Sequence, residues 1–403
     1  MIESYDNMKI VMFYHAINQV SGAAKVYVQM ASYWAENGHS VTILSHYGLP
    51  KSLYPISPKV KLKTAGILRK HIPNKIIRNL LSPLMIPALY STIKQEKPDL
   101  LIVNNAPYYG LLYATVLSKL KDTPLIIWKH SGYFMKSSPM YKVTRKLCFP
   151  KADAIVLLTD GDKKHAMEYN ANCFCIMNPV EQIKYEEETK IEPEGQDNNN
   201  TAVFVGRLAE QKSLNHLLKA WGKAIPAIPQ WKLIIVGDGE KRKKLEALVK
   251  KLNISDSVSF TGVVENVNPY YKNASFFVMS SMHEGLPVSL IEAASSGLPL
   301  ISYDCPYGPA VVIEHDKNGL LVESGNIDAL SEAIVQMANS LEMRKTFSDA
   351  SRQKISKFSI ERIVKQWDAV FHFVLTGEKF NLQDEQLKKE KIPKERSGYS
   401  ANH

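Results

Sequence analysis

Short apolar segments alternate with helical segments along most of this chain, and they form two separate series. The first series places apolar segments at residues 9–14, 41–45, 100–104, 125–128 and 154–158. The second places them at residues 202–205, 232–236, 258–260, 276–279 and 299–302. Apolar strands separated by helices are typical of a parallel sheet that helices cover on both faces. The pattern therefore predicts an α/β fold with two parallel sheets.

A polar segment at residues 186–201 separates the two series and combines charged residues with Pro, Gly and Asn, which favour loops. The 403 residues leave room for two domains of ordinary size. We predict two doubly wound, Rossmann-like domains over residues 1–179 and 180–357, with a ligand cleft beyond the carboxyl ends of their strands. Residues 381–403 are charged and poor in apolar side chains, so we expect a mobile tail there.

Cysteine content and hydrophobicity exclude several classes of protein. Four cysteines are too few for a disulfide scaffold, and Cys305 has no neighbouring group that would activate its thiol. No segment has the roughly 18 consecutive apolar residues that a membrane-spanning helix needs. The first residues lack the basic and apolar regions of a signal peptide. We therefore expect a cytoplasmic protein in which Cys305 has a structural role.

Positive charge is concentrated in the first half of the chain. Residues 1–180 hold 22 Lys and Arg against 10 Asp and Glu, and residues 51–97 contain a single acid, Glu96. Apolar residues interleave with these cations, a combination that suits the surface of an anionic membrane. A solvated basic face over a buried helix would give the same pattern. Nucleic acid is not an expected partner, because no DNA- or RNA-binding motif accompanies the charge.

Two cations follow the first strand of the second series. Arg207 and Lys212 lie between the strand at 202–205 and a helix expected over 214–221, for which Ser213 is a plausible N-cap. The start of a helix offers free N–H groups and positive potential to an anion. Arg207 could bind a diphosphate through two nitrogens, and Lys212 could add a single charge. Plain surface charge is the alternative interpretation.

Two acids follow the strand at 276–279. Glu284 stands in the loop and Glu292 on the next helix, whose first turn suits Pro287 and whose end suits Gly297. We expect Glu284 to point into the cleft and Glu292 to lie deeper along the same wall. This arrangement suits one ligand with hydroxyl groups at both ends. The alternative is a helix cap at Glu284 and an exposed helix acid at Glu292.

Three further strand ends carry candidate ligand-binding residues. Gly22, after the first strand, would let the backbone approach a phosphate, although no Gly-x-Gly-x-x-Gly fingerprint is present. The turn at 304–309 is rich in Gly and Pro and has the same potential. His130, after the fourth strand, could face the cleft as a hydrogen-bonding group or as an acid or base. A structural histidine is the alternative.

Together, these residues resemble glycosyltransferase family 4, which comprises retaining sugar-nucleotide transferases of the GT-B fold. The resemblance rests on Gly206-Arg207-Leu208 with Gln211-Lys212, on EGLPVSLIEA at 284–293, on Gly297-Leu298-Pro299 and on NGLLV at 318–322. A weaker match covers residues 21–44. The resemblance implies the GT-B fold, and it extends over residues 9–376. The chain departs from the family pattern at Ser213, where glycine is usual, and at Ala24, where an acid is common.

The resemblance also implies roles for individual residues. Arg207 and Lys212 would bind the donor diphosphate, and Glu292 would bind the ribose hydroxyl groups. Glu284 would act at the donor sugar, next to the reacting centre, and His130 would lie near that sugar. The helical segment at 358–380 would cross back onto the first domain. The other implied donor-binding residues are Gly22, Gly285, Leu286, Pro287 and Val288.

The implied reaction moves a hexose or N-acetylhexosamine from a nucleotide sugar, expected to be UDP-linked, to a glycan or lipid-linked glycan acceptor. Such reactions build cell-surface polysaccharides, lipopolysaccharide included, and this family retains the anomeric configuration. Cations and helix starts would stabilise the leaving diphosphate without a metal, and no cofactor is expected. The basic first half fits an enzyme on the inner face of the cell membrane. A sugar-nucleotide epimerase of the same fold and a non-catalytic nucleotide- or carbohydrate-binding protein are the alternatives.

Overall fold

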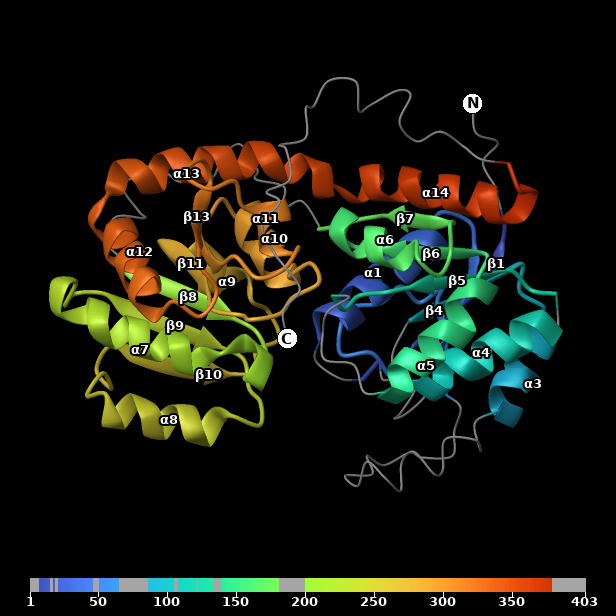
Figure 1. The fold of residues 1–403 in the computed structure, drawn as a ribbon, viewed down its shortest axis with the longest axis horizontal. Coiled ribbons are helices and arrows are strands. Elements are labelled where there is room, and N and C mark those ends of the chain that lie inside the picture. The colour runs from blue at the N-terminus through green and yellow to red at the C-terminus, as the bar shows by residue number, and fades with distance from the viewer. Residues whose placement is uncertain are drawn as a thin grey trace.

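The computed structural model describes residues 7–14, 17–18, 21–45, 51–64, 86–104, 108–120, 122–132, 139–180 and 200–378. The tail expected at 381–403 and the cationic residues at 65–85 lie outside these ranges. We call the part up to residue 180 the N-lobe and the part from 200 to 358 the C-lobe (Figure 1). None of the helices in the described ranges combines the length and the apolar character that crossing a bilayer requires.

The N-lobe is built on a seven-stranded parallel sheet with the order β3-β2-β1-β4-β5-β6-β7. Its strands are β1 (Lys9–Tyr14), β2 (Ser40–Ser45), β3 (Lys61–Thr64), β4 (Leu100–Asn104), β5 (Leu125–Trp128), β6 (Ala154–Leu157) and β7 (Cys173–Cys175). Its helices are α1 (Gly22–Glu36), α3 (Ile86–Glu96), α4 (Tyr108–Leu120), α5 (Pro139–Cys148) and α6 (Asp160–Ala166). The central strands are buried on both faces, which explains their continuous apolar sequences.

The C-lobe is built on a six-stranded parallel sheet with the order β10-β9-β8-β11-β12-β13. Its strands are β8 (Thr201–Val205), β9 (Lys232–Val236), β10 (Val258–Gly262), β11 (Phe276–Met279), β12 (Leu300–Tyr303) and β13 (Gly319–Val322). Its helices are α7 (Leu214–Ala224), α8 (Arg242–Lys251), α9 (Asn268–Lys272), α10 (Val288–Ser295), α11 (Pro309–Val312), α12 (Ile327–Asn339) and α13 (Leu341–Lys354). In both sheets the strand order reverses at the lobe's first strand, the point where open α/β sheets bind ligands.

The ten strands predicted from the sequence are all present, with ends that differ by at most two residues. Three strands were missed, namely β3, β7 and β13, and each lies at an edge of its sheet. An edge strand has a neighbour on one side only, and β3 and β7 are short and only partly buried. Their sequences therefore lack the long apolar run that marked the central strands.

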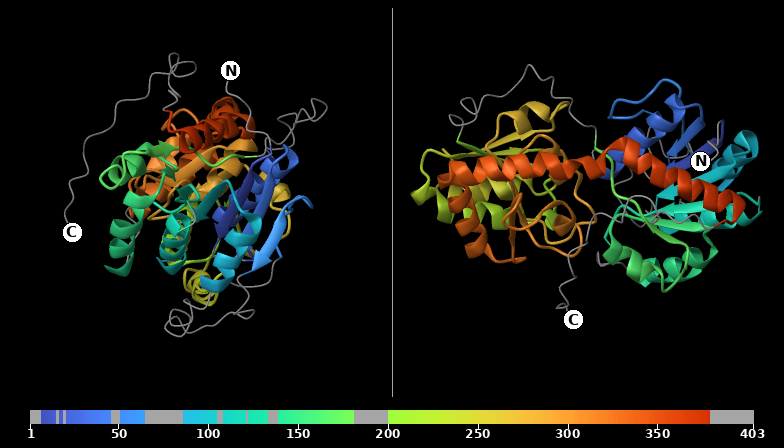
Figure 2. Two further views of the ribbon diagram at one scale, coloured as in Figure 1. Left: turned by 90° about the vertical axis from the view of Figure 1, so that its right-hand side faces the viewer. Right: turned by 90° about the horizontal axis from the view of Figure 1, so that it is seen from above.

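Helix α14 (Ile360–Thr376) follows the C-lobe in sequence but packs on the N-lobe. The view from above in Figure 2 shows α13 on the C-lobe followed by α14 on the N-lobe, so the chain passes from the C-lobe to the N-lobe. The Trp367 ring lies 5.4 Å from the Trp34 ring and 4.8 Å from the Trp128 ring. Phe371 packs on the same cluster, 5.2 Å from Trp34. The chain thus returns to the N-lobe, while the exact domain limits stay a prediction.

Candidate active site

The loop after β8 places Arg207 and Lys212 at the carboxyl edge of the C-lobe sheet. The backbone N–H of Leu208 donates to the carbonyl of Asp238 over 3.0 Å and holds the loop against the end of β9. A Cβ on Gly206 would lie 3.6 Å from Cε of Lys212, so the lysine side chain passes over the glycine next to Arg207. Arg207 is exposed and has no ion-pair partner among the described residues. Its guanidinium is therefore available to an anionic ligand.

Lys212 forms an ion pair with Glu284, although the sequence assigned the two residues to separate loops. Nζ of Lys212 lies 2.7 Å from Oε1 of Glu284, and the side chains are 13% and 9% exposed. The hydroxyl of Ser280 lies within 3.0 Å of the carbonyl of Lys212, which fastens the loop after β11 to the loop after β8. The carboxylate that we expected to point into the cleft therefore contacts the cation that we expected at the diphosphate.

Ser213 occupies the N-cap position of α7 as predicted, but its side chain forms no capping hydrogen bond. Its φ of 43° lies in the left-handed region, and its hydroxyl instead donates to the carbonyl of Glu210 over 3.3 Å. The family usually has glycine at this position, and a positive φ is the conformation that glycine adopts most readily. Ser213 therefore adopts here a conformation that a glycine would adopt more readily.

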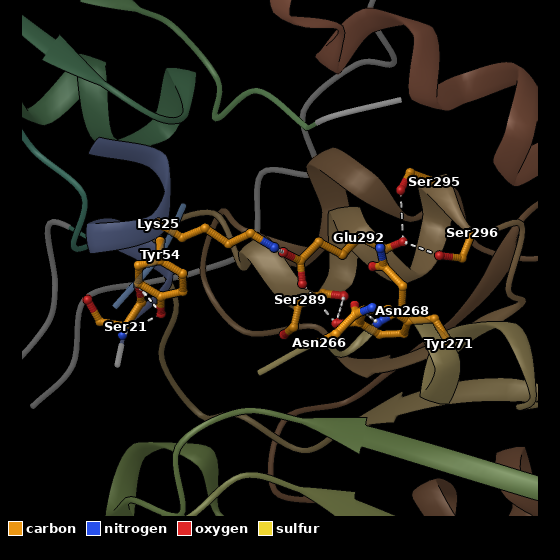
Figure 3. A network of polar contacts seen from close by, with 10 residues as sticks. All are labelled: Ser21, Lys25, Tyr54, Asn266, Asn268, Tyr271, Ser289, Glu292, Ser295 and Ser296. Carbon is orange, nitrogen blue, oxygen red and sulfur yellow. Dashed lines mark hydrogen bonds and ion pairs between the residues drawn. The ribbon is translucent and has the colours of Figure 1, made fainter. Parts of the chain in front are cut away.

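Glu292, on α10, has a partner on each lobe (Figure 3). Its Oε2 accepts a hydrogen bond of 2.9 Å from the hydroxyl of Tyr271, on α9, and its Oε1 contacts the ammonium of Lys25, on α1. Burial raises the pKa of Tyr271 well above its ordinary value, so this hydroxyl stays protonated and is the donor of the hydrogen bond. The Glu292 side chain is 14% exposed. The alternative of an exposed helix acid is therefore wrong.

Gly22 lies where α1 of the N-lobe meets α10 of the C-lobe. Ser21 caps α1 by accepting the N–H of Ala24 over 3.1 Å, which sets where the helix begins. A Cβ on Gly22 would lie 3.1 Å from both Cβ and Cγ2 of Val288, closer than ordinary van der Waals contact. The absence of a side chain at Gly22 therefore lets the two helices approach each other. A phosphate contact at Gly22 stays a prediction.

The loops after β5 and β11 also meet, backbone against backbone. A Cβ on Gly132 would lie 2.6 Å from the carbonyl oxygen of Glu284, and a Cβ on Gly285 would lie 2.7 Å from the carbonyl oxygen of His130. Neither position accepts a side chain unless the backbone moves. The N-lobe therefore helps to hold the segment that carries Glu284.

Leu286 and Pro287 are buried and lead directly into α10. The carbonyl of Leu286 accepts a hydrogen bond of 3.1 Å from Nδ2 of Asn178, in the segment after β7. The helix begins at Val288, so Pro287 precedes it rather than lying in its first turn as we expected. The first N–H groups of a helix have no acceptor within it, so the start of α10 can receive an anion.

Burial determines what His130 can do. Both ring nitrogens are buried and have no hydrogen-bond partner among the residues that the structure describes. The imidazole lies against the Trp128 ring, with centroids 4.3 Å apart, and burial lowers the pKa of His130 to about 3. The ring is therefore neutral near pH 7, where it can donate or accept a hydrogen bond but carries no acidic proton to deliver.

The turn at 304–309 forms a further contact between the lobes. Burial raises the pKa of Cys305 to about 12, which keeps the thiol protonated and agrees with a structural role. Tyr307 has a φ of 70°, and its hydroxyl lies 3.2 Å from Nε2 of His165 on α6. Its ring occupies the space next to Gly161, where a Cβ would lie 2.1 Å from Cδ1 of Tyr307. A phosphate or sugar contact of this turn stays a prediction.

Sequence reasoning missed Lys25 and Tyr271, and it named the turn at 304–309 without singling out Tyr307. Lys25 lies one helical turn after Gly22, and that spacing could have marked it as a residue near the same ligand. No pattern in the sequence links Tyr271 to Glu292, 21 residues away, or Tyr307 to His165, 142 residues away. These pairs arise only when the chain folds.

Comparison with known proteins identifies the family and the class of enzyme that this chain resembles. The family model for Glycosyltransferase Family 4 matches residues 20–181, and the model for Glycosyl transferases group 1 matches residues 186–354. The amylovoran biosynthesis glycosyltransferase AmsD of Erwinia amylovora is 26% identical over 372 residues, which cover 90% of this chain and 99% of AmsD. Together these matches confirm the resemblance and the class of enzyme that the sequence predicted.

Two further proteins describe the relatives and the fold. An alpha-1,4-N-acetyl-D-galactosaminyltransferase of Campylobacter jejuni, whose acceptor is a GalNAc-containing glycan on PP-undecaprenol, is 28% identical over 366 residues, covering 89% of this chain and 97% of that protein. The Anabaena protein HepE, solved with UDP and glucose, has a TM-score of 0.70 at 17% identity, covering 90% of this chain and 98% of that chain. Relatives thus act in cell-surface polysaccharide assembly, and the predicted GT-B fold is confirmed.

Proposed function

This chain belongs to glycosyltransferase family 4, and we propose that it transfers a hexose or N-acetylhexosamine from a UDP-sugar to a glycan or lipid-linked glycan, with retention of configuration. The Lys212–Glu284 ion pair, next to the exposed Arg207, carries the proposal. When the bond between the donor sugar and its diphosphate breaks, negative charge grows on the leaving diphosphate. Cations that are already in place stabilise that charge without reorganising during the reaction.

The carboxylate of Glu284 suits the opposite end of the same bond. The donor sugar gains positive character as the diphosphate leaves, as in other glycosyl transfers. Glu284 lies 2.7 Å from Lys212, so one side chain can face the sugar while the other faces the diphosphate. Neutral His130 would supply a hydrogen bond to the sugar, because its nitrogens are unpaired among the described residues. Attack by the acceptor on the face that the diphosphate leaves would retain configuration.

Nucleotide binding is the first test. We would measure calorimetric binding of UDP, GDP and ADP to the wild type, to Glu292→Ala and to Glu332→Ala, which removes an exposed acid on α12. We expect selective binding of UDP that weakens at least about tenfold in Glu292→Ala only, because ribose hydroxyl groups would lose a charged acceptor. A preference for GDP would overturn the UDP assignment. If none of the three nucleotides binds, the result would favour a carbohydrate-binding protein.

Product analysis is the second test. The enzyme would be incubated with UDP-hexoses or UDP-N-acetylhexosamines and a mixture of lipid-linked glycans, and the products examined by NMR. We expect released UDP and a new glycosidic bond with the configuration of the donor. An inverted bond would overturn retention. A UDP-sugar that is epimerised without transfer would instead establish the epimerase alternative.

We also propose that the N-lobe binds an anionic membrane surface, which would bring a lipid-linked acceptor to the enzyme. The exposed face of α5 carries Lys142, Val143, Lys146 and Leu147, and both apolar residues are at least half exposed. Val116, on the neighbouring α4, adds an exposed apolar side chain. Cations mixed with exposed apolar groups suit lipid headgroups and the upper acyl region.

Liposome flotation tests this membrane proposal. Wild type should float with vesicles that contain anionic lipid and remain unbound with neutral vesicles. The double variant Lys142→Glu and Lys146→Glu should lose most of this binding, since each cation near an anionic surface contributes about 1 kcal/mol. Lys243→Glu with Lys244→Glu on α8 is the matched control, because α8 belongs to the C-lobe. Equal flotation of both double variants and the wild type would contradict the assignment to α5.

A further inference from the structure

Lys25 links the N-lobe to the carboxylate that we assign to ribose. It lies in the first turn of α1, and its ammonium contacts Oε1 of Glu292 on α10 (Figure 3). The side chains of Lys25 and Glu292 are 39% and 14% exposed. The pair is therefore partly shielded from solvent, where a charge-assisted hydrogen bond is stronger than on an open surface.

The position of Lys25 is set by contacts at the start of α1. Ser21 caps the helix, and the hydroxyl of Tyr54 accepts from the N–H of Ser21 over 2.9 Å and donates to its carbonyl over 3.0 Å. The contact of Gly22 with Val288 brings α1 close to α10. Lys25 therefore reaches Glu292 from an anchored turn, not from a mobile loop.

The two partners of Glu292 leave acceptor capacity for a ligand. A carboxylate offers about four lone-pair sites. Tyr271 uses one site on Oε2 and Lys25 uses one on Oε1, so each oxygen keeps a second site. Two vicinal hydroxyl groups of a ribose would match these two sites.

We propose that Lys25 is a positioning residue that holds the Glu292 carboxylate toward the ribose, so that nucleotide affinity depends on a residue of the N-lobe. The inference rests on the proposed nucleotide-sugar donor and on the ribose role of Glu292. Lys25 acts through Glu292 and not on the phosphates. Its effect is therefore specific to the ribose hydroxyl groups and independent of the number of phosphates.

The experiment compares nucleotides that differ at one group. Binding of UDP, UMP and 2′-deoxy-UDP would be measured by calorimetry with the wild type, Lys25→Met and Lys25→Arg. Lys59→Met is the matched control, because Lys59 forms an exposed ion pair with Glu36 at the other end of α1. Thermal melting of every variant would show that it folds. Lys25 is partly exposed, so Met, which is similar in length, fits the same space.

We expect Lys25→Met to weaken UDP and UMP by the same factor, about tenfold, which corresponds to one charge-assisted hydrogen bond. It should weaken 2′-deoxy-UDP less, so that the preference for UDP over 2′-deoxy-UDP shrinks. Lys25→Arg should stay within about threefold of the wild type, since it keeps the cation. Lys59→Met should bind all three nucleotides as the wild type does.

Other results would overturn the inference in distinguishable ways. A larger loss for UDP than for UMP would mean that Lys25 contacts the diphosphate directly. Unchanged affinities in Lys25→Met would show that the ion pair joins the lobes without affecting nucleotide binding. The proposed function would then still stand. If the wild type binds no nucleotide, the proposed function itself fails.

Discussion

The N-lobe and the C-lobe are built on the same strand order, but they present different chemistry where they meet. In each sheet the first strand of the lobe lies third from one edge, and the order reverses there. The C-lobe contributes Arg207, Lys212, Glu284 and Glu292. The N-lobe contributes mainly backbone at Gly22 and Gly132. One topology therefore supplies the charges in one lobe and a closely fitting surface in the other.

This difference between the lobes shows that two similar sheets can have different tasks in one protein. Strand-end loops can carry any side chain, because the sheet beneath them sets their position. In the C-lobe these loops carry the Lys212–Glu284 ion pair and the exposed Arg207. In the N-lobe the glycines allow backbone to lie within contact distance of the C-lobe, and Lys25 is the ionic link between α1 and Glu292. Each prediction below perturbs one side of this division.

Removing the positive charge of Lys212, in the C-lobe, should have the largest effect on activity. We expect Lys212→Met to lower kcat with a UDP-sugar about a hundredfold, because the leaving diphosphate loses a positioned charge. Glu284→Gln should also lose activity. Unlike Lys212→Met, this variant keeps the cation and leaves no unpaired carboxylate. Lys219→Met, an exposed lysine on α7, is the control. A change of less than threefold in Lys212→Met would assign the chemistry to other groups.

Adding one methyl group at the lobe contact should have the next largest effect. A Cβ at Gly285 would lie 2.7 Å from the carbonyl oxygen of His130, so Gly285→Ala has to push the loops apart. We expect about a tenfold loss of activity, with a decrease of about 1–3 kcal/mol in the free energy of unfolding. Gly222→Ala on α7 is the control, because its nearest neighbour would lie 3.8 Å away. Wild-type activity in Gly285→Ala would show that the contact does not shape the site.

Acidification should lower the stability of the N-lobe, because His130 is buried in its neutral form. Its pKa in the folded protein is about 3, below the ordinary 6.5, so the unfolded chain takes up a proton first as the pH falls. The stability that depends on neutral His130 is therefore present above about pH 6.5 and is lost below it. Between pH 7 and pH 5 we expect a loss on the order of 1–2 kcal/mol. Urea unfolding of wild type and His130→Gln at both pH values measures it, and parallel pH dependences would contradict it.

Removal of metal ions should have the smallest effect. We expect turnover of a UDP-sugar to continue unchanged in EDTA, since Arg207, Lys212 and the start of α10 supply the positive charge. Within the described ranges, no group of three or more His, Cys, Asp or Glu side chains could hold a metal ion. Activity that disappears in EDTA and returns with Mg²⁺ or Mn²⁺ would contradict this expectation.

Much of the fold and part of the site were predictable from local sequence. The central strands were found because burial on both faces demands continuous apolar residues, as at Leu100–Asn104. The edge strands β3 and β7 were missed because partial burial relaxes that demand, as at Lys61–Thr64. Arg207, Lys212, Glu284 and Glu292 could be chosen as candidate site residues because they stand at strand ends and helix starts, and their roles stay a prediction. Their mutual contacts were not predictable.

The sequence alone determined the two sheets and the charged residues in the loops of the C-lobe. It did so because periodicity, turn residues and the family motifs are all local. Only the tertiary structure decided that Lys212 meets Glu284 and that Lys25 meets Glu292, 72 and 267 residues apart. It also decided that Gly132 and Gly285 face backbone of the other lobe. The first contact depends on the pairing of β8 with β11 inside one sheet, and the others depend on how the two lobes pack together. No local pattern in the chain encodes either arrangement.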